Sequence, residues 1–468
     1  MNDHEVNGRL RVDLLVRNGY VVTVDRDRRI IKNASIAVSN GNIVAVGKSA
    51  DIDESYEATR YIDASEAIVI PGLVDAHVHA GAEHVARSAV PDDTRETWLT
   101  EWAVPLYAAM TPDEEFVGAQ LACYEMMLNG TTTFCEGGSV VHMDAVYSAV
   151  SASGMRATLG PWLWDQVEVP ERFKRSTQQA LRHIEATFDR FHQKDGSLVR
   201  IAASCVNPAV CSEELLRGLF MIAQEHESVF EFHHGSRWEP VVEFERKTGK
   251  RPIEALDAIG VIGRQTHAAH MVHLDDNEIA ILAEKGASVA YCPQAALRCG
   301  YGLSRRGRMP ELQRAGVDVA LGSDGVNSSD NQDLFKVMQI AAGLFKDARE
   351  NTSIFPAESV LEMATIRGAR ALGLEDVTGS LEVGKSADIV LLDRRCPELT
   401  PLIDVANAIV YGCDGRRVRT VICRGNVLVE GGRVQVGDLD EALDTAEKVG
   451  DSLFRRAGLK PSGRWPVS

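Results

Sequence analysis

The chain contains Ala67-Ile68-Val69-Ile70-Pro71-Gly72-Leu73-Val74-Asp75-Ala76-His77-Val78-His79, an apolar run that ends in two histidines two positions apart. Side chains of a β-strand alternate between its two faces, so His77 and His79 point the same way if the strand continues through them. Two imidazoles at one point can ligate a metal ion. A His-x-His pair alone is more often accidental, so it needs support from the rest of the chain.

Length and charge restrict the class of protein. The 468 residues are enough for one large domain with a smaller one attached. The 67 acidic and 50 basic residues give a net charge of −17, which disfavours binding to nucleic acid. No run of about 18 apolar residues occurs, so we expect no membrane-spanning segment.

The cysteines and the N-terminus indicate a compartment. The nine cysteines are an odd number and form no Cys-x-x-Cys pair, which favours reduced core thiols over disulfides or a zinc finger. The polar start at Met1–Glu5 lacks the apolar segment of a signal peptide. We therefore expect a cytoplasmic protein whose partner is a small-molecule substrate, not nucleic acid or a membrane.

The two ends of the chain are rich in predicted strands, and the segment between them has a different pattern. Residues 1–66 contain short β-branched and aliphatic runs separated by turn signals such as Asn18-Gly19 and Asn40-Gly41, and residues 378–436 have the same texture. This pattern predicts one small β-sandwich domain built from both parts of the chain. Residues 437–468 are expected to form a helical tail, with a helix over 439–459.

The middle of the chain, residues 67–377, alternates short apolar strands with amphipathic helices. This pattern favours a (β/α)₈ TIM barrel over a doubly wound sheet, whose Gly-rich dinucleotide motif is absent. The eight expected strands are Ile68–Val74, Thr131–Phe134, Arg156–Leu159, Val199–Ala203, Val229–His233, Thr266–Ala269, Ser288–Tyr291 and Val317–Leu321.

Polar side chains follow four of these strands where each strand ends. His77 and His79 follow the first strand, His233 or His234 the fifth, His270 the sixth and Asp324 the eighth. The carboxyl ends of barrel strands meet at one face, where chemistry gathers. Each residue alone is more often a buried hydrogen-bonding group or a turn residue. Their joint occurrence predicts a metal site with room for a water molecule.

Several further stretches make the chain similar to a known family. It resembles the amidohydrolase superfamily and, within it, the branch of atrazine chlorohydrolase and S-adenosylhomocysteine deaminase, over nearly its whole length. The matching stretches are Pro71–His79, Asn129–Phe134, Ala269–Leu274, Tyr291-Cys292-Pro293, Ser323-Asp324-Gly325 and Gly379–Asp388.

The resemblance implies one divalent metal, with Zn²⁺ expected first and Fe²⁺ as the alternative. Its ligands would be His77, His79, a histidine of the fifth strand and Asp324, while His270 would hydrogen-bond the attacking water or the substrate. A metal lowers the pKa of bound water towards 7. Asp324 can then accept a proton, and an imidazole can stabilise developing negative charge. Relatives are commonly dimers or larger, so a homo-oligomer is expected.

The fifth strand departs from the pattern of the relatives. An ungapped comparison places His233 on the ligand and leaves His234 on the opposite face. It also places Ser236 where relatives carry a glutamate that moves protons, and a hydroxyl is a poor general base. Glu239 and Glu136 are alternatives for that role, although a solvated side chain is the more frequent interpretation of each; in a third alternative, Asp324 and His270 act without such a glutamate.

The loop after the first strand offers candidates for the substrate pocket. His84 and Arg87 are interpreted either as pocket residues or as ordinary surface residues. Trp98 is a candidate wall of an apolar pocket, although aromatic residues more often serve packing.

These features predict a metal-dependent hydrolase that uses activated water on a C–N bond of a small, heterocyclic substrate and releases ammonia or an amine. The first alternative is a dehalogenating hydrolase or one acting on amides, ureas or carbamates. A halide leaves without a proton, so dehalogenation fits the missing glutamate best. The remote alternative is a non-catalytic scaffold, which the intact histidines and Asp324 argue against.

Overall fold

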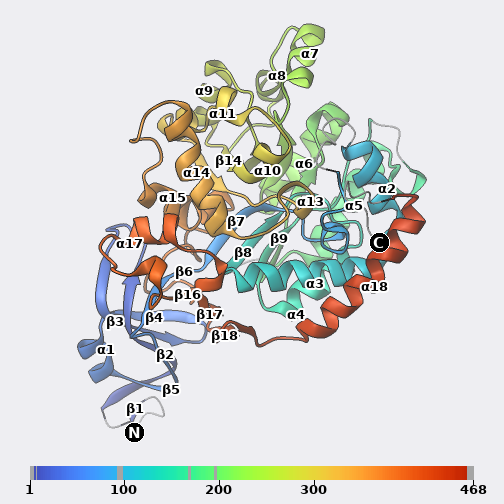
Figure 1. Ribbon diagram of the computed structural model, residues 1–468. Coiled ribbons are helices and arrows are strands. Elements are labelled where there is room, and N and C mark those ends of the chain that lie inside the picture. Colours follow the sequence, from blue (N-terminus) through green and yellow to red (C-terminus); the bar gives the residue numbers. More distant parts are fainter. Residues whose placement is uncertain (1–4, 7, 92–97, 167–169, 194–197, 461–468) are drawn as a thin grey trace, which may run out of the picture.

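A computed structural model describes residues 5–6, 8–91, 98–166, 170–193 and 198–460. Its centre consists of two parallel sheets, ordered β10-β9-β8-β7 and β11-β12-β13-β14-β15, with helices on the outside (Figure 1). The strands are β7 (Leu73–Val78), β8 (Thr131–Glu136), β9 (Arg156–Leu159), β10 (Val199–Ile201), β11 (Ala203–Cys205), β12 (Phe230–His234), β13 (Thr266–His270), β14 (Ser288–Tyr291) and β15 (Asp318–Leu321).

The two sheets close into one barrel. β10 and β11 are separated only by Ala202 and together occupy the position of the fourth strand. At the other seam, the backbone N–H of Asp324 donates to the carbonyl of His77 at 2.8 Å, and Val78 and Asp324 form a parallel bridge. The eight strand positions agree with the predicted (β/α)₈ architecture.

Helices follow the barrel strands, and local signals set their ends. α3 begins with a capping box in which Thr111 and Glu114 bond each other's backbone N–H groups, and α9 ends at Gly286 in the left-handed region. The α-helices are α1 (Ser49–Ser55), α2 (Val104–Ala109), α3 (Pro112–Leu128), α4 (Met143–Ser153), α5 (Thr177–Phe191), α6 (Glu213–Glu225), α7 (Trp238–Thr248), α8 (Pro252–Ala258), α9 (Asp276–Lys285), α10 (Pro293–Arg298), α11 (Leu303–Arg306), α12 (Met309–Arg314), α13 (Val326–Ser329), α14 (Leu334–Ala348), α15 (Ala357–Met363), α16 (Ile366–Ala371), α17 (Val405–Asn407) and α18 (Leu439–Ala457).

A ten-stranded sheet joins the two terminal parts of the chain. β6 connects them, because it pairs antiparallel with β16 and parallel with β2. Figure 1 shows the blue N-terminal strands beside the orange and red strands β16 to β18. The strands are β1 (Glu5–Val6), β2 (Arg9–Val22), β3 (Ile30–Ser39), β4 (Asn42–Lys48), β5 (Tyr56–Asp63), β6 (Ala67–Pro71), β16 (Ile389–Asp393), β17 (Val418–Cys423), β18 (Asn426–Glu430) and β19 (Arg433–Val434).

The apolar run before His77 serves both sheets. The strand expected over 68–74 is two strands, β6 in the ten-stranded sheet and β7 in the barrel, with Gly72 between them. A Cβ at Gly72 would lie 2.1 Å from Oγ1 of Thr132, so this crossing requires glycine. Periodicity could not reveal the break, because both strands are buried on both faces.

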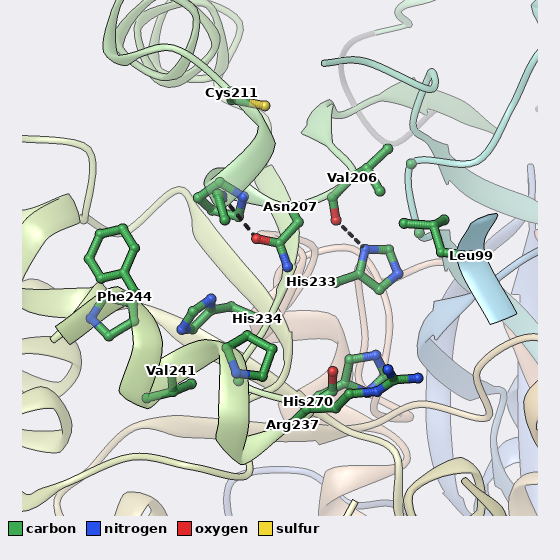
Figure 2. Close-up of a pocket in the computed structure, with 18 of the residues that line it drawn as sticks. Leu99, Val206, Asn207, Cys211, His233, His234, Arg237, Val241, Phe244 and His270 are labelled. Atoms are coloured by element: carbon green, nitrogen blue, oxygen red, sulfur yellow. Dashed lines mark hydrogen bonds between the residues drawn. The ribbon is translucent and has the colours of Figure 1, made fainter. Parts of the chain in front are cut away.

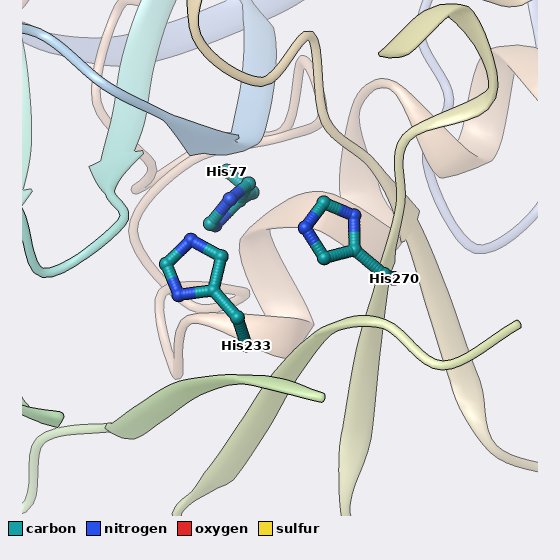
Figure 3. A group of neighbouring side chains, drawn as sticks. All are labelled: His77, His233 and His270. Atoms are coloured by element: carbon teal, nitrogen blue, oxygen red, sulfur yellow. The ribbon is translucent and has the colours of Figure 1, made fainter. Parts of the chain in front are cut away.

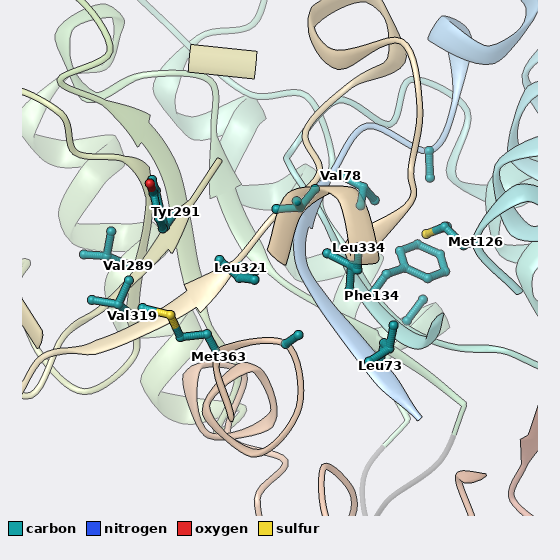
Figure 4. Close-up of a cluster of buried hydrophobic side chains, with 14 of the residues drawn as sticks. Leu73, Val78, Met126, Phe134, Val289, Tyr291, Val319, Leu321, Leu334 and Met363 are labelled. Atoms are coloured by element: carbon teal, nitrogen blue, oxygen red, sulfur yellow. The ribbon is translucent and has the colours of Figure 1, made fainter. Parts of the chain in front are cut away.

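The barrel core fills with side chains from neighbouring strands and the helices around them. Figure 4 shows Leu73, Phe134, Val289 and Leu321 in this cluster, together with Leu334 of α14. Within the described residues, every helix is too short or too polar to cross a membrane. All nine cysteines are free. The helix expected at the C-terminus is α18, which packs against α3, and residues 461–468 of the expected tail lie outside the described residues.

A buried ion pair ties the barrel to the terminal sheet. Arg156, on β9, lies 3.4 Å from the carboxylate of Asp388, and both side chains are 1% exposed. Asp388 also accepts from the Thr378 hydroxyl at 2.7 Å and from the backbone N–H of Arg424 at 2.8 Å. Burial opposes ionisation of Asp388, yet Arg156 and these donors keep its pKa below its ordinary value.

Replacing Arg156 with methionine should lower the free energy of unfolding by about 3–5 kcal/mol, because the Asp388 carboxylate stays buried without its cation. The control is Arg190→Met, which breaks the Arg190–Asp144 pair, whose side chains are each 64% exposed. That change should cost less than about 1 kcal/mol. Urea unfolding measures both values, and equal losses would contradict the role given to the buried pair.

Candidate metal centre

Five side chains from four strand ends converge at the carboxyl end of the barrel. Nε2 of His79 lies 3.2 Å from Nε2 of His233 and 3.4 Å from Oδ1 of Asp324. Nε2 of His77 lies 3.7 Å from the same oxygen, and Nε2 of His270 lies 4.0 Å from Oδ2. Figure 3 shows the rings of His77, His233 and His270 turned towards one another. The fold therefore gathers the imidazoles and the carboxylate that the sequence singled out.

Hydrogen bonds fix the tautomers of two of these histidines. Nδ1 of His233 lies 3.0 Å from the carbonyl of Val206, which can only accept, so Nδ1 carries the proton. Nδ1 of His77 lies 2.9 Å from the carboxylate of Glu231 and donates to it. In both rings Nε2 therefore keeps its lone pair and faces the shared centre.

A chain of hydrogen bonds through Ser139 fixes the tautomer of His79 as well. Ser139 donates its hydroxyl proton to the carboxylate of Glu136, so its oxygen accepts from Nδ1 of His79 at 3.0 Å. Nε2 of His79 is then the third nitrogen with a free lone pair at this point. Three imidazoles held by outer hydrogen bonds are the usual arrangement around a protein-bound metal.

The donor atoms fit a divalent metal. Nε2 of His77 is buried and has no hydrogen-bond partner among the described residues. Ligand atoms around a tetrahedral ion with bonds of about 2.0 Å lie about 3.3 Å apart. The spacings of 3.2 to 3.7 Å among His77, His79, His233 and Asp324 are close to that value.

Electrostatics favour positive charge at this centre. Burial would raise the pKa of Asp324, but hydrogen bonding to His79 and the nearby histidines hold it well below the ordinary value. Burial lowers the pKa of His233 to about 3, which keeps that ring neutral and able to ligate. Burial also acts against protonation of His79, but Asp324 and Glu136 raise its pKa well above the ordinary value. The carboxylates thus draw a cation, either a proton or a metal, to this point.

The backbone is strained where two of the five residues leave their strands. His270 has φ 74° and Asp324 has φ 65°, in the left-handed region that disfavours side chains with a Cβ. Such conformations cluster at functional sites, where they direct a side chain that a regular strand would turn away. At Asp324 this conformation accompanies the hydrogen bond that closes the barrel.

The fifth strand separates its two histidines. His233 joins the centre, whereas His234 has its ring elsewhere on the cavity wall (Figure 2). Burial and the nearby Arg251 and His273 lower the pKa of His234 to about 4. The alternation of side chains along β12 therefore favours His233 as the residue that faces the other donors.

A cavity of about 540 Å³ opens above the centre. Its lining is largely apolar and includes Trp98 and Ser236, two of the residues singled out as pocket candidates. Asp324, His79, His233 and His270 form its polar end. A substrate in this cavity would meet the candidate centre at one end and apolar walls along most of its length.

The other residues that the sequence singled out for the pocket or for proton transfer do not line the cavity. His84 and Arg87 do not line the cavity; both contact the carboxylate of Glu125, where the Arg87 guanidinium forms an ion pair. Glu239 is exposed on α7 and also lies outside the lining. The preferred interpretation of Glu136 as a solvated side chain is wrong, because it is fully buried and holds Ser139.

The outer hydrogen-bond partners of the histidines were not among the residues predicted from the sequence. Glu231 stands two positions before His233 on the same strand. Because side chains alternate along a strand, this spacing could have placed Glu231 on the same face as His233. Ser139 carried no comparable signal, since it lies in a loop after β8. Tyr301, whose ring centroid is 5.5 Å from that of His270, comes from the turn before α11 and was likewise not predictable.

The barrel and the site define a metal-dependent barrel hydrolase. The chain belongs to the amidohydrolase family, whose profile, "Amidohydrolase family", matches residues 68–428. The resemblance seen in the sequence is thereby confirmed. The protein is a metal-dependent hydrolase that acts on C–N bonds.

Deaminases stand among its relatives. A 5-methylthioadenosine/S-adenosylhomocysteine deaminase of Syntrophobacter fumaroxidans is 35% identical over 446 residues, covering 95% of this chain and 99% of that protein. A 5′-deoxyadenosine deaminase of Methanosarcina mazei is 34% identical over 453 residues, covering 95% and 99%.

The solved structures that resemble this chain include two kinds of enzyme. An adenosine deaminase from Xanthomonas campestris with bound zinc has a TM-score of 0.89 at 28% identity, covering 96% of this chain and all of that chain. Atrazine chlorohydrolase TrzN from Arthrobacter aurescens TC1, complexed with zinc, has a TM-score of 0.84 at 25% identity, covering 93% of this chain and 100% of that chain.

A buried histidine below the site should make stability depend on pH. Nε2 of His267, on β13, donates to the carbonyl of Ala76 at 2.8 Å, next to His77. Burial lowers its pKa from 6.5 to about 4. The unfolded chain therefore takes up this proton first as the pH falls. The stabilisation is complete above pH 6.5 and is lost towards pH 4, by about 3 kcal/mol in all.

In the variant His267→Gln the new side chain stays neutral at every pH, so the pH dependence that His267 contributes should disappear. The free energy of unfolding of this variant should therefore fall less steeply between pH 6.5 and 4 than that of the wild type. Chemical denaturation of EDTA-treated protein at several pH values measures the slope. An unchanged slope in His267→Gln would refute the assignment.

Proposed function

We propose that the protein is a mononuclear metal-dependent aminohydrolase that removes an amino group from a heterocyclic ring and releases ammonia. The observation that carries the proposal is the convergence of three Nε2 lone pairs, from His77, His79 and His233, with the Asp324 carboxylate at the end of one cavity. The deaminases among its relatives support the choice of reaction.

His77, His79, His233 and Asp324 would hold the metal, and zinc is the proposed ion. Nitrogen and carboxylate donors suit zinc, with Fe²⁺ as the alternative. The structures of the adenosine deaminase and of TrzN contain zinc. When bound, the metal would lower the pKa of a water molecule towards 7 and so supply the nucleophile.

Asp324 and His270 would move the protons. The low pKa of Asp324 keeps it ionised at neutral pH, so its carboxylate can accept a proton from the attacking water. His270 lines the cavity, and its Nδ1 has no partner among the described residues, so it can hydrogen-bond the reacting ring. Ser236 borders the cavity but cannot replace a carboxylate as a base, so the proton for the leaving amine would return from Asp324.

The variants His233→Ala and His234→Ala should separate the ligand from its neighbour. His233→Ala removes a lone pair from the centre, so metal per chain should fall well below one and turnover should be lost. His234→Ala should keep about one ion per chain. Elemental analysis of the purified proteins measures the metal content, and Asp324→Asn should lose turnover. A wild-type protein without stoichiometric metal would overturn the proposal.

Dehalogenation is the second candidate, favoured by Ser236. An amine needs a proton to leave, whereas a halide does not, so a site with a hydroxyl where relatives have glutamate is better suited to a halide. The TrzN structure shows that the fold also hosts a chlorohydrolase.

Matched pairs of rings that differ only in an amino or a chloro substituent should decide between the two reactions. We expect ammonia release from the amino member to exceed halide release from the chloro member at equal substrate concentration. An ammonia electrode and ion chromatography measure the two products. Release of halide without ammonia would replace the aminohydrolase by the chlorohydrolase.

The proposal extends to the rest of the molecule. We propose that the ten-stranded sheet forms a small β-sandwich, because Leu14 and Val16 pack in one buried cluster and Leu15 and Ala37 in another, as expected for the two faces of a folded sheet. The nine free thiols support a cytoplasmic location of the protein.

Assembly of the protein into a dimer or larger oligomer stays a prediction.

A further inference from the structure

One cation faces the cavity and has no counterion among the residues that the structure describes. Arg237 is the residue before α7, and its extended backbone (φ −125°, ψ 148°) makes no side-chain cap to the helix. Among the described residues that line the cavity, Arg237 is the single lysine or arginine, and it forms no salt bridge or hydrogen bond with any described side chain. In the view of Figure 2, Arg237 and His270 overlap, and both lie away from Phe244.

The charge of Arg237 reaches the polar end of the cavity. The Tyr301 ring lies 5.5 Å from the ring of His270. Burial raises the pKa of Tyr301 well above its ordinary value, and the Arg237 guanidinium acts in the opposite direction. Arg237 is therefore within electrostatic range of the residues that surround the reacting atoms.

The acidic groups of the cavity wall are already engaged. Glu213 pairs with Arg217 at 2.7 Å, and Asp324 belongs to the metal centre. The remaining wall near α7 and α8 is apolar and includes Val241, Phe244 and Leu256. A guanidinium that faces such a cavity lacks a partner, and an anion would supply one.

A second cation packs on Trp238, the residue that follows Arg237. The Arg306 guanidinium lies over the Trp238 ring at 4.3 Å, and no salt bridge to Arg306 occurs in the described part of the chain. Arg306 lies outside the cavity lining, so Arg237 is the one arginine or lysine of the described lining, in a chain whose net charge is −17. Local positive charge of this kind attracts and orients anionic ligands.

We propose that the substrate carries an anionic group, a carboxylate in the simplest case, on or beside the heterocycle that reacts, and that Arg237 binds it. This inference rests on the proposed function. The planar guanidinium can bond both oxygens of a carboxylate, which fixes the orientation of the ring over the centre. The apolar walls then contact the rest of the substrate.

Kinetics with a matched pair of rings test this inference. The probes are 4-aminopyrimidine and 4-aminopyrimidine-5-carboxylate, followed by ammonia release. The wild type should prefer the carboxylate. Arg237→Met should raise KM for the carboxylate roughly 10- to 100-fold and leave KM for the neutral ring unchanged, whereas Arg237→Lys should recover part of the loss. The control is Arg246→Met, an exposed arginine of the same helix outside the cavity lining, which should behave as wild type.

Calorimetry separates this inference from the proposed function. Benzoate should bind the metal-loaded wild type more tightly than benzamide, and Arg237→Met should abolish the preference while Arg246→Met keeps it. If no ring releases ammonia but this result holds, the aminohydrolase fails and the anion site stands. A preference for benzamide, or a benzoate preference that survives Arg237→Met, would overturn the inference, since the carboxylate would then bind elsewhere, for example at the metal.

Discussion

The backbone hydrogen bond from Asp324 to the carbonyl of His77 is the contact on which the rest depends. It joins the first barrel strand to the residues that follow the last one and so closes the barrel. The same pair brings the Asp324 carboxylate beside the imidazoles of β7. The same residue therefore closes the barrel and completes the site. The left-handed backbone at Asp324 is tolerated because the hydrogen bond and the position of the carboxylate both require it.

The outer hydrogen bonds give the site its chemistry. Glu231, Ser139 and the carbonyl of Val206 each fix the proton of one histidine on Nδ1, which leaves three Nε2 atoms for a cation. A cluster of imidazoles without these partners would take mixed tautomers and would bind a metal less well. The membership of the amidohydrolase family and the zinc in related structures agree with this arrangement.

The departure that the sequence led us to expect concerns the cavity and not the centre. Ser236 borders the cavity where a carboxylate was expected, and Arg237 beside it contributes a positive charge that has no counterion in the described part of the chain. A neutral hydroxyl next to a cation alters what the cavity can bind while the donor set stays intact. The cavity, and not the donor set, is therefore where we expect the selectivity for substrates to arise.

The sequence by itself determined the barrel, its strand order and the strand ends at which His77, His79, His270 and Asp324 stand, because strand periodicity and position at strand ends are local properties. It also favoured His233 over His234 by the alternation of side chains. Only the tertiary structure decided that Gly72 divides one apolar run between two sheets. It also showed that Glu136 is buried, that His84 and Arg87 contact Glu125, and that Arg237 faces the cavity. These facts depend on contacts between residues far apart in the chain, which no local pattern encodes.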